Sequence, residues 1–162
     1  MLNDLYYSHK IRYLINMTDN LIRRFYFLIA IVCIDDNGGM MFNNRRQSRD
    51  SILIDKITEI TKGSKLWLNK YSYSLFEDKN MSNINVDESF VLEAANGEYC
   101  FVENVSLKGY EKWIEKLIVF KWNRVYPKDF EFELDLSEWK LTESSEFQGS
   151  SHDKITMEVY VK

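Results

Sequence analysis

The residues with the clearest capacity for chemistry stand together in one polar segment, residues 43–50. The candidates are Asn44, Arg45, Arg46, Gln47, Ser48, Arg49 and Asp50. Arginine forks and amide groups suit phosphates, carboxylates and flat heterocycles, because they donate several hydrogen bonds at once. The start of a helix favours anions rather than cations, so arginines just ahead of a helix indicate an anionic ligand or a carboxylate partner. The alternative is a solvated loop that ends in a helix N-cap.

A second grouping surrounds His152, which has Ser150, Ser151 and Asp153 as neighbours. Serine, histidine and aspartate together are typical of nucleophilic catalysis, but the side chains of adjacent residues diverge. A plain turn is therefore the preferred interpretation of this segment. The sequence shows no spacing of ligands typical of a metal site, so no metal is predicted.

The whole chain has the composition of a globular domain rather than of a general nucleic-acid binder. It has 162 residues, of which 45% are apolar, and a net charge of −4, whereas nucleic-acid binders usually present a basic face. Cys33 and Cys100 stand in apolar runs and are interpreted as buried free thiols, which favours a reducing, cytoplasmic location. The longest apolar run, residues 25–34, is too short to span a membrane.

The pattern of apolar residues predicts one α/β domain over residues 25–162, after an N-terminal extension over residues 1–24. Residues 25–34 are apolar on both faces, as in a central strand covered on both sides. Residues 35–50 are predicted as a polar loop, and residues 51–61 as an amphipathic helix capped by Asp50 or Ser51. The other predicted elements are strands over residues 65–68, 85–86, 98–102 and 117–122, helices over 71–76, 87–95 and 109–116, and a C-terminal antiparallel pair over 139–147 and 155–161.

Both ends of this domain resemble one known family. Tyr126–Phe130, Asp135–Leu141 and Glu158–Tyr160 are similar to the C-terminal end of dihydrofolate reductase. The first strand with Ile34–Gly39 is similar to the beginning of that family, and the order of elements between them fits. The resemblance implies a three-layer α/β fold with a mostly parallel central sheet, flanking helices and a C-terminal antiparallel hairpin.

The resemblance also places two basic residues near a ligand cleft. Lys121 and Arg124 stand at the end of the fourth clear strand, which adjoins the cleft in that fold. Lys121 falls where the family has a threonine that bonds its catalytic carboxylate, and it could pair with Asp35, Asp50 or a bound anion. A packed Trp122 beside a surface Arg124 is the alternative.

The reductase chemistry of that family fits this sequence less well than the fold does. Leu53 stands at the position of the family's buried carboxylate, and Glu103-Asn104 replaces the Gly-Gly that lets the backbone approach the cofactor pyrophosphate. An anionic side chain there opposes phosphate binding; the preferred role of the pair is to cap a following helix, with cation binding as the alternative. Lys70 and Ser72 replace a phosphate-binding arginine and threonine, and Lys lacks the bidentate fork. We therefore expect no cofactor, with NADPH as the disfavoured alternative.

Three segments, residues 43–50, 122–127 and 149–152, also resemble short bacterial proteins labelled ribonuclease Z. The metal cluster of ribonuclease Z, His-x-His-x-Asp-His, has no counterpart here, because the only histidines are His9 and His152. We therefore do not expect the two-metal hydrolysis of ribonuclease Z from this chain.

The preferred hypothesis is a non-reductase ligand- or partner-binding domain, a pseudoenzyme with a rebuilt cleft. It would hold a small anionic or heterocyclic ligand, or a protein partner, between Asn44, Arg45, Arg46, Gln47, Ser48, Asp50 and Lys121. One alternative is a divergent NADPH-dependent reductase of a pterin or other heterocycle. The other is an RNA-acting protein, which the arginine cluster alone favours and the net charge opposes.

Overall fold

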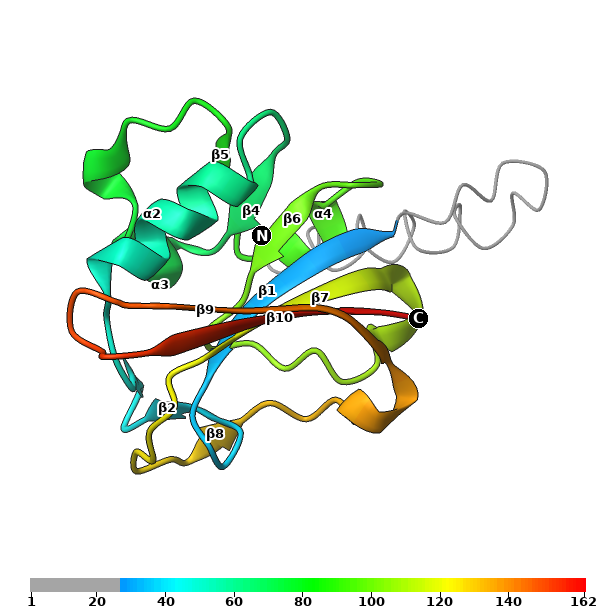
Figure 1. Cartoon of the computed structure of the whole chain (residues 1–162). Coiled ribbons are helices and arrows are strands. Elements are labelled where there is room, and N and C mark those ends of the chain that lie inside the picture. The colour runs from blue at the N-terminus through cyan, green and yellow to red at the C-terminus, as the bar shows by residue number, and fades with distance from the viewer. Residues whose placement is uncertain (1–26) are drawn as a thin grey trace.

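The computed structural model describes residues 27–162, so the expected extension over residues 1–24 lies outside the described residues. A seven-stranded sheet forms the centre of the fold, in the order β5-β4-β6-β1-β7-β10-β9 (Figure 1). Its strands are β1 (Leu28–Ile34), β4 (Leu66–Leu68), β5 (Ile84–Val86), β6 (Tyr99–Phe101), β7 (Ile114–Lys121), β9 (Lys140–Phe147) and β10 (Ile155–Val161).

The first five strands in this order run parallel, and the last two run antiparallel at one edge. β1 pairs in parallel with both β6 and β7, and β4 pairs in parallel with β5 and β6. β10 is antiparallel to both β7 and β9. The predicted mostly parallel sheet with a C-terminal antiparallel hairpin is therefore confirmed.

The central strand β1 supplies both hydrophobic cores, because successive side chains of a strand point to opposite faces. Ile29 and Ile31 lie in the core that α2 (Ser51–Ile60) covers, whereas Ala30 and Val32 lie in the core on the other face. Figure 1 shows α2 packed against one side of the sheet. β1 is thus buried from both sides, as its continuous apolar sequence predicts.

The second face of the sheet is covered by short elements rather than by long helices. They include α4 (Phe90–Glu93) and the 3₁₀ turns η2 (Glu111–Trp113) and η3 (Leu136–Glu138). On the first face, α3 (Lys70–Tyr73) and the 3₁₀ turn η1 (Glu77–Lys79) follow β4. The helices predicted over residues 71–76 and 87–95 are therefore both shorter than expected.

The helix predicted over residues 109–116 is wrong. Only η2 forms there, and β7 begins at Ile114, which pairs with Leu28 of β1. The apolar residues Trp113, Ile114 and Leu117 suit either element locally. Ile114 and Leu117 are both fully buried in the strand that forms, and this burial favours the strand over the helix.

The segment predicted as a polar loop, residues 35–50, instead contains two strands of a small second sheet. β2 (Gly39–Phe42) pairs with β3 (Arg45–Arg46) on one side and with β8 (Phe130–Glu131) on the other. Asn43 and Asn44 connect β2 to β3, and both have positive φ, of 49° and 58°. Asparagine tolerates this conformation, which a two-residue hairpin turn requires. The turn therefore places Arg45 and Arg46 on a strand.

Helix α2 gives a direct test of this packing. We expect Ile57→Ala to lower the free energy of unfolding by about 2–5 kcal/mol, because Ile57 is fully buried against the sheet. Ile52→Ala is the matched control on the same helix, since Ile52 is 42% exposed, and it should cost less than about 1 kcal/mol. Urea unfolding followed by circular dichroism measures both; equal losses would contradict the packing of α2.

Candidate functional site

Asp50 is the residue that joins the start of α2 to the loop between β9 and β10. Its Oδ1 accepts hydrogen bonds from the backbone N–H groups of Ile52 and Leu53, at 3.1 and 3.2 Å, so it caps the helix as predicted. The same oxygen accepts from the backbone of Ser150 at 3.0 Å, and Oδ2 accepts from the backbone of Ser151 at 2.8 Å. One carboxylate thus fixes two segments that are about 100 residues apart.

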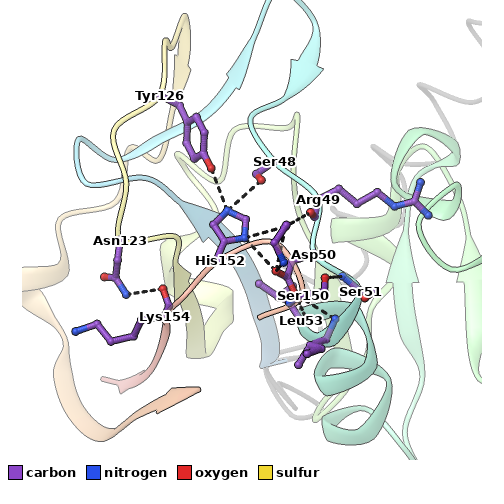
Figure 2. A network of polar contacts seen from close by, with 12 residues as sticks. Ser48, Arg49, Asp50, Ser51, Leu53, Asn123, Tyr126, Ser150, His152 and Lys154 are labelled. Atoms are coloured by element: carbon purple, nitrogen blue, oxygen red, sulfur yellow. Dashed lines mark hydrogen bonds and ion pairs between the residues drawn. The ribbon is translucent and has the colours of Figure 1, made fainter. Parts of the chain in front are cut away.

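The Asp50 carboxylate also orients the ring of His152. Nδ1 of His152 lies 3.0 Å from Asp50 Oδ2 (Figure 2). Burial alone would raise the pKa of Asp50, but hydrogen bonds from the Ser151 backbone, His152 and the Ser150 backbone outweigh it and lower the pKa well below its usual range. An ionised carboxylate only accepts hydrogen bonds, so Nδ1 of His152 carries a proton and donates it.

The other ring nitrogen of His152 faces two hydroxyl groups. Nε2 lies 3.1 Å from Ser48 Oγ and 3.0 Å from Tyr126 Oη, as Figure 2 shows. The ring is stacked on Trp122 with 4.6 Å between ring centroids, and His152 is buried. In a neutral ring that donates from Nδ1, Nε2 accepts. Asp50 and Trp122 thus fix the ring with Nε2 directed at the hydroxyl groups of Ser48 and Tyr126.

The interpretation of His152 as part of a plain turn missed these contacts. Its sequence neighbour Asp153 is exposed, and Ser150 reaches the site through its backbone. Ser151 Oγ lies 3.1 Å from Nδ1, on the side of Asp50 rather than of Ser48. The hydrogen-bond partners of His152 come from distant segments, so local sequence held no signal for them.

Arg46 and Glu103 form an ion pair beside this cluster, in which Glu103 is buried and Arg46 is partly exposed. Nε and Nη2 of Arg46 donate to the two oxygens of Glu103 at 2.9 and 3.1 Å, a bidentate geometry. Ser72 Oγ donates to Glu103 Oε2 at 2.7 Å, and the guanidinium lies 4.5 Å from the centre of the Tyr71 ring. Burial would lower the pKa of Arg46, but Glu103 raises it, so the guanidinium stays charged. The charges of Arg46 and Glu103 therefore neutralise each other within the protein.

The predicted role of Glu103 and Asn104 as the cap of a following helix is wrong. No helix begins directly after β6, and the next helical turn is η2 at Glu111. Asn104 instead accepts from Asn69, whose own Oδ1 caps α3. Of the two weak cofactor candidates, Ser72 is buried against Glu103, and Lys70 is exposed.

A groove of about 590 Å³ lies between the β2–β3 hairpin and the segment that follows β7. It is lined by Phe42, Asn43, Arg45, Arg46, Gln47, Tyr126 and Pro127. Asp35 supports its walls, because Oδ2 accepts from Gln47 Nε2 at 3.2 Å and from the Tyr126 backbone at 2.9 Å. Gln47 Oε1 is buried and has no hydrogen-bond partner within residues 27–162. The groove thus presents an exposed arginine, Arg45, beside the side chain of Gln47.

A narrow crevice next to this groove reaches towards the sheet. Its lining includes Cys33, Ser48, Arg49, Asp50 and Leu53. The crevice has about 20 Å³ of space, which is enough for about one water molecule. Burial raises the pKa of the Cys33 thiol, so it is not a thiolate. Protein groups thus nearly fill the crevice around Leu53.

Three other candidate residues lie apart from the groove. Lys121 Nζ lies 2.7 Å from Glu158 on β10, and so pairs neither with Asp35 nor with Asp50. Arg124 and Asn44 are exposed and do not line the groove. The structure thus divides the predicted set between the groove, the Arg46–Glu103 pair and the Asp50–His152 cluster. Sequence reasoning missed Phe42 and Tyr126 as members of this site.

Two searches of the described residues concern metals and membranes. Residues 27–162 contain no group of three or more His, Cys, Asp or Glu side chains placed to hold a metal ion. Over the same range, no helix has the length and apolar character needed to cross a membrane. Both cysteines are free; Cys100 is buried, and Cys33 is partly exposed.

Comparison with known proteins identifies the fold. No protein-family model and no curated protein matches the chain. Among solved structures, it is similar to the dihydrofolate reductase from Enterococcus faecalis complexed with NADP(H) and RAB-propyl, with a TM-score of 0.61 and 15% identity over 84% of this chain and 98% of that chain. A likeness at this identity shows the fold alone. The chain therefore has the expected dihydrofolate-reductase-like α/β fold, and a likeness to ribonuclease Z is not shown.

The lowered pKa of Asp50 predicts a pH-dependent contribution to stability. Asp50→Asn should lower the free energy of unfolding by about 2–4 kcal/mol at pH 7, because buried backbone donors lose an ionised acceptor. An acid whose folded pKa is depressed contributes fully above its unfolded pKa, about 3.9, and loses that contribution as the pH falls further. The difference between wild type and Asp50→Asn should therefore shrink below about pH 4.

Urea unfolding between pH 7 and pH 3 measures this difference. Asp153→Asn is the matched control, because Asp153 neighbours His152 and is exposed; it should leave stability nearly unchanged at every pH. A wild-type advantage over Asp50→Asn that stays constant down to pH 3 would contradict the ionised, buried carboxylate.

Proposed function

We propose that this protein is a non-reductase binding domain, which takes a small anionic or flat heterocyclic ligand in the groove beside Arg45. The observation that carries the proposal is the bidentate pair of Arg46 with the buried Glu103, which Ser72 also supports. In dihydrofolate reductases, the family that the sequence resembles, two glycines stand in place of Glu103 and Asn104 and admit a cofactor pyrophosphate. Here a carboxylate fills that place and its charge is already paired.

Binding of a cofactor pyrophosphate at the Arg46–Glu103 ion pair is unfavourable. A pyrophosphate would have to approach a carboxylate that is 8% exposed, and like charges repel strongly where little water screens them. If Arg46 turned to the phosphates, Glu103 would be left buried without its cation, which costs several kcal/mol, about 3–5 in comparable cases. These costs favour a binding domain over a divergent NADPH-dependent reductase.

The groove supplies what a ligand of the proposed kind needs. Arg45 is exposed and makes no ion pair within the described part of the chain, so its full hydrogen-bonding fork is available. Phe42, 40% exposed, offers an aromatic face. A groove of about 590 Å³ is within the size range of small-molecule sites. The two free thiols favour a reducing compartment, the cytoplasm, for this activity.

A thermal-shift titration tests the proposal with NADPH, NADP, dihydrofolate, a panel of nucleotides and short RNAs. A ligand that binds only the folded state adds about 2.7 kcal/mol of stability at 100 times its Kd, which raises the Tm of a domain of this size by about 5–10 °C. We expect no shift with NADPH and a shift with an anionic member of the panel. Arg45→Ala should abolish that shift.

Arg124→Ala is the control, because Arg124 is equally exposed and does not line the groove. Arg45 is a cleaner choice than Arg46, whose removal would leave Glu103 unpaired. A clear shift with NADPH would overturn the proposal in favour of a reductase. Salt-sensitive RNA binding that Arg45→Ala removes would favour an RNA-acting protein. If no compound shifts the Tm, the small-ligand proposal fails and a protein partner becomes the preferred hypothesis.

A further inference from the structure

We propose that Ser48, His152 and Asp50 form a nucleophile–base–carboxylate triad that hydrolyses small carboxylic esters at the edge of the groove. The geometry carries this inference: Ser48 Oγ is 3.1 Å from His152 Nε2, and His152 Nδ1 is 3.0 Å from Asp50 Oδ2. Such a serine, a base within hydrogen-bond reach and a carboxylate that orients the base are the three parts of an activated nucleophile. Figure 2 shows the contact from Ser48 to one nitrogen of the His152 ring and the contact from Asp50 to the other.

Asp50 meets the requirements of the orienting carboxylate. It is buried, and backbone N–H groups from α2 and from the β9–β10 loop hold both of its oxygens. The carboxylate can therefore neither rotate away from His152 nor pair with a cation instead. It fixes the ring with the proton on Nδ1 and leaves Nε2 as the acceptor, which is the tautomer that a general base requires.

Ser48 meets the requirements of the nucleophile. It is partly exposed and lies between β3 and the cap of α2, on the wall of the narrow crevice. Its hydroxyl has His152 as its one hydrogen-bond partner within residues 27–162. In the same range, the backbone N–H groups of Ser48 and Arg49 donate to no backbone carbonyl. The other serines near His152 contact Asp50 or its side of the ring.

Tyr126 connects this triad to the groove. Its hydroxyl shares Nε2 of His152 with Ser48, at 3.0 Å, and its ring lines the groove. A compound in the groove therefore lies next to Tyr126, whose hydroxyl contacts the base that would activate Ser48. Substrates would be small esters, because the crevice beside Ser48 holds only about 20 Å³ and the larger space is on the groove side.

The reaction balances without an added cofactor. Ser48 Oγ forms a bond to the ester carbonyl carbon as its proton passes to His152 Nε2. The tetrahedral oxyanion then expels the alcohol, which takes the proton back from His152, and an acyl ester of Ser48 is left. Water attacks this acyl ester with His152 again as the base, releasing the carboxylic acid and free Ser48. The sum is ester plus water giving acid plus alcohol.

The test is covalent labelling of the full chain by a fluorophosphonate probe, read by intact mass and peptide mapping, together with hydrolysis of p-nitrophenyl acetate. We expect one probe per chain, attached to Ser48, and loss of labelling and hydrolysis in Ser48→Ala. His152→Asn should slow labelling by about 100-fold or more, because it removes the base. Ser145→Ala, on exposed β9, is the matched serine control and should label like wild type.

Two outcomes overturn the triad: a folded wild type that takes no label, or a label that persists in Ser48→Ala. The thermal melt of each variant shows that it is folded; Ser48→Ala removes one partly exposed hydroxyl and keeps the Asp50 contacts. The inference does not rest on the proposed ligand. Ser48→Ala should lose the label and keep the ligand shift, so the triad can fail while the ligand site holds.

Discussion

The buried carboxylate of Asp50 is the interaction on which the rest of this structure depends. A charge without access to water is tolerated only where donors surround it, and here the donors come from the first turn of α2 and from the β9–β10 loop. The hairpin edge of the sheet is thereby fixed to the helix that covers the core. Gly149 belongs to the same constraint, because a Cβ at that position would lie 2.3 Å from Asp50 Oδ2.

Asp50 is one of three buried acids at the same end of the sheet, and each is satisfied from within the protein. Asp35 follows β1 and accepts from Gly39, Gln47 and Tyr126; Glu103 follows β6 and pairs with Arg46. Ligands of open α/β sheets bind beyond the carboxyl ends of strands, and in this chain the protein's own charges occupy that space. The space that is left lies further out, beside the β2–β3 hairpin, where Arg45 is exposed.

The sequence predicts the parts of the fold that local patterns determine, and misses those that distant contacts determine. The apolar run of β1, the alternation of the C-terminal hairpin and the Asp50 cap of α2 each depend on neighbouring residues, and all three are confirmed. The helix over residues 109–116 fails because pairing with β1 overrides local periodicity. The role of Glu103 is misread for the same reason, and the contacts of His152 could not be predicted, since the partners Arg46, Ser48 and Asp50 are 57 to 104 residues away. The polar segment around Arg45 is found because its chemistry is contiguous in the sequence.

Under the proposed triad, the shared use of Asp50 would couple stability to reactivity. The same oxygen that anchors the Ser151 backbone orients His152, so any change at Asp50 alters the helix cap, the hairpin and the base together. Ser48 is different, because its hydroxyl contacts only the far nitrogen of the ring within the described residues. The carboxylate oxygens of Asp50 are already satisfied without Ser48, so the contact between Ser48 and His152 is not needed to hold the hairpin. Reactivity at Ser48 therefore separates a catalytic arrangement from one that only holds the hairpin in place.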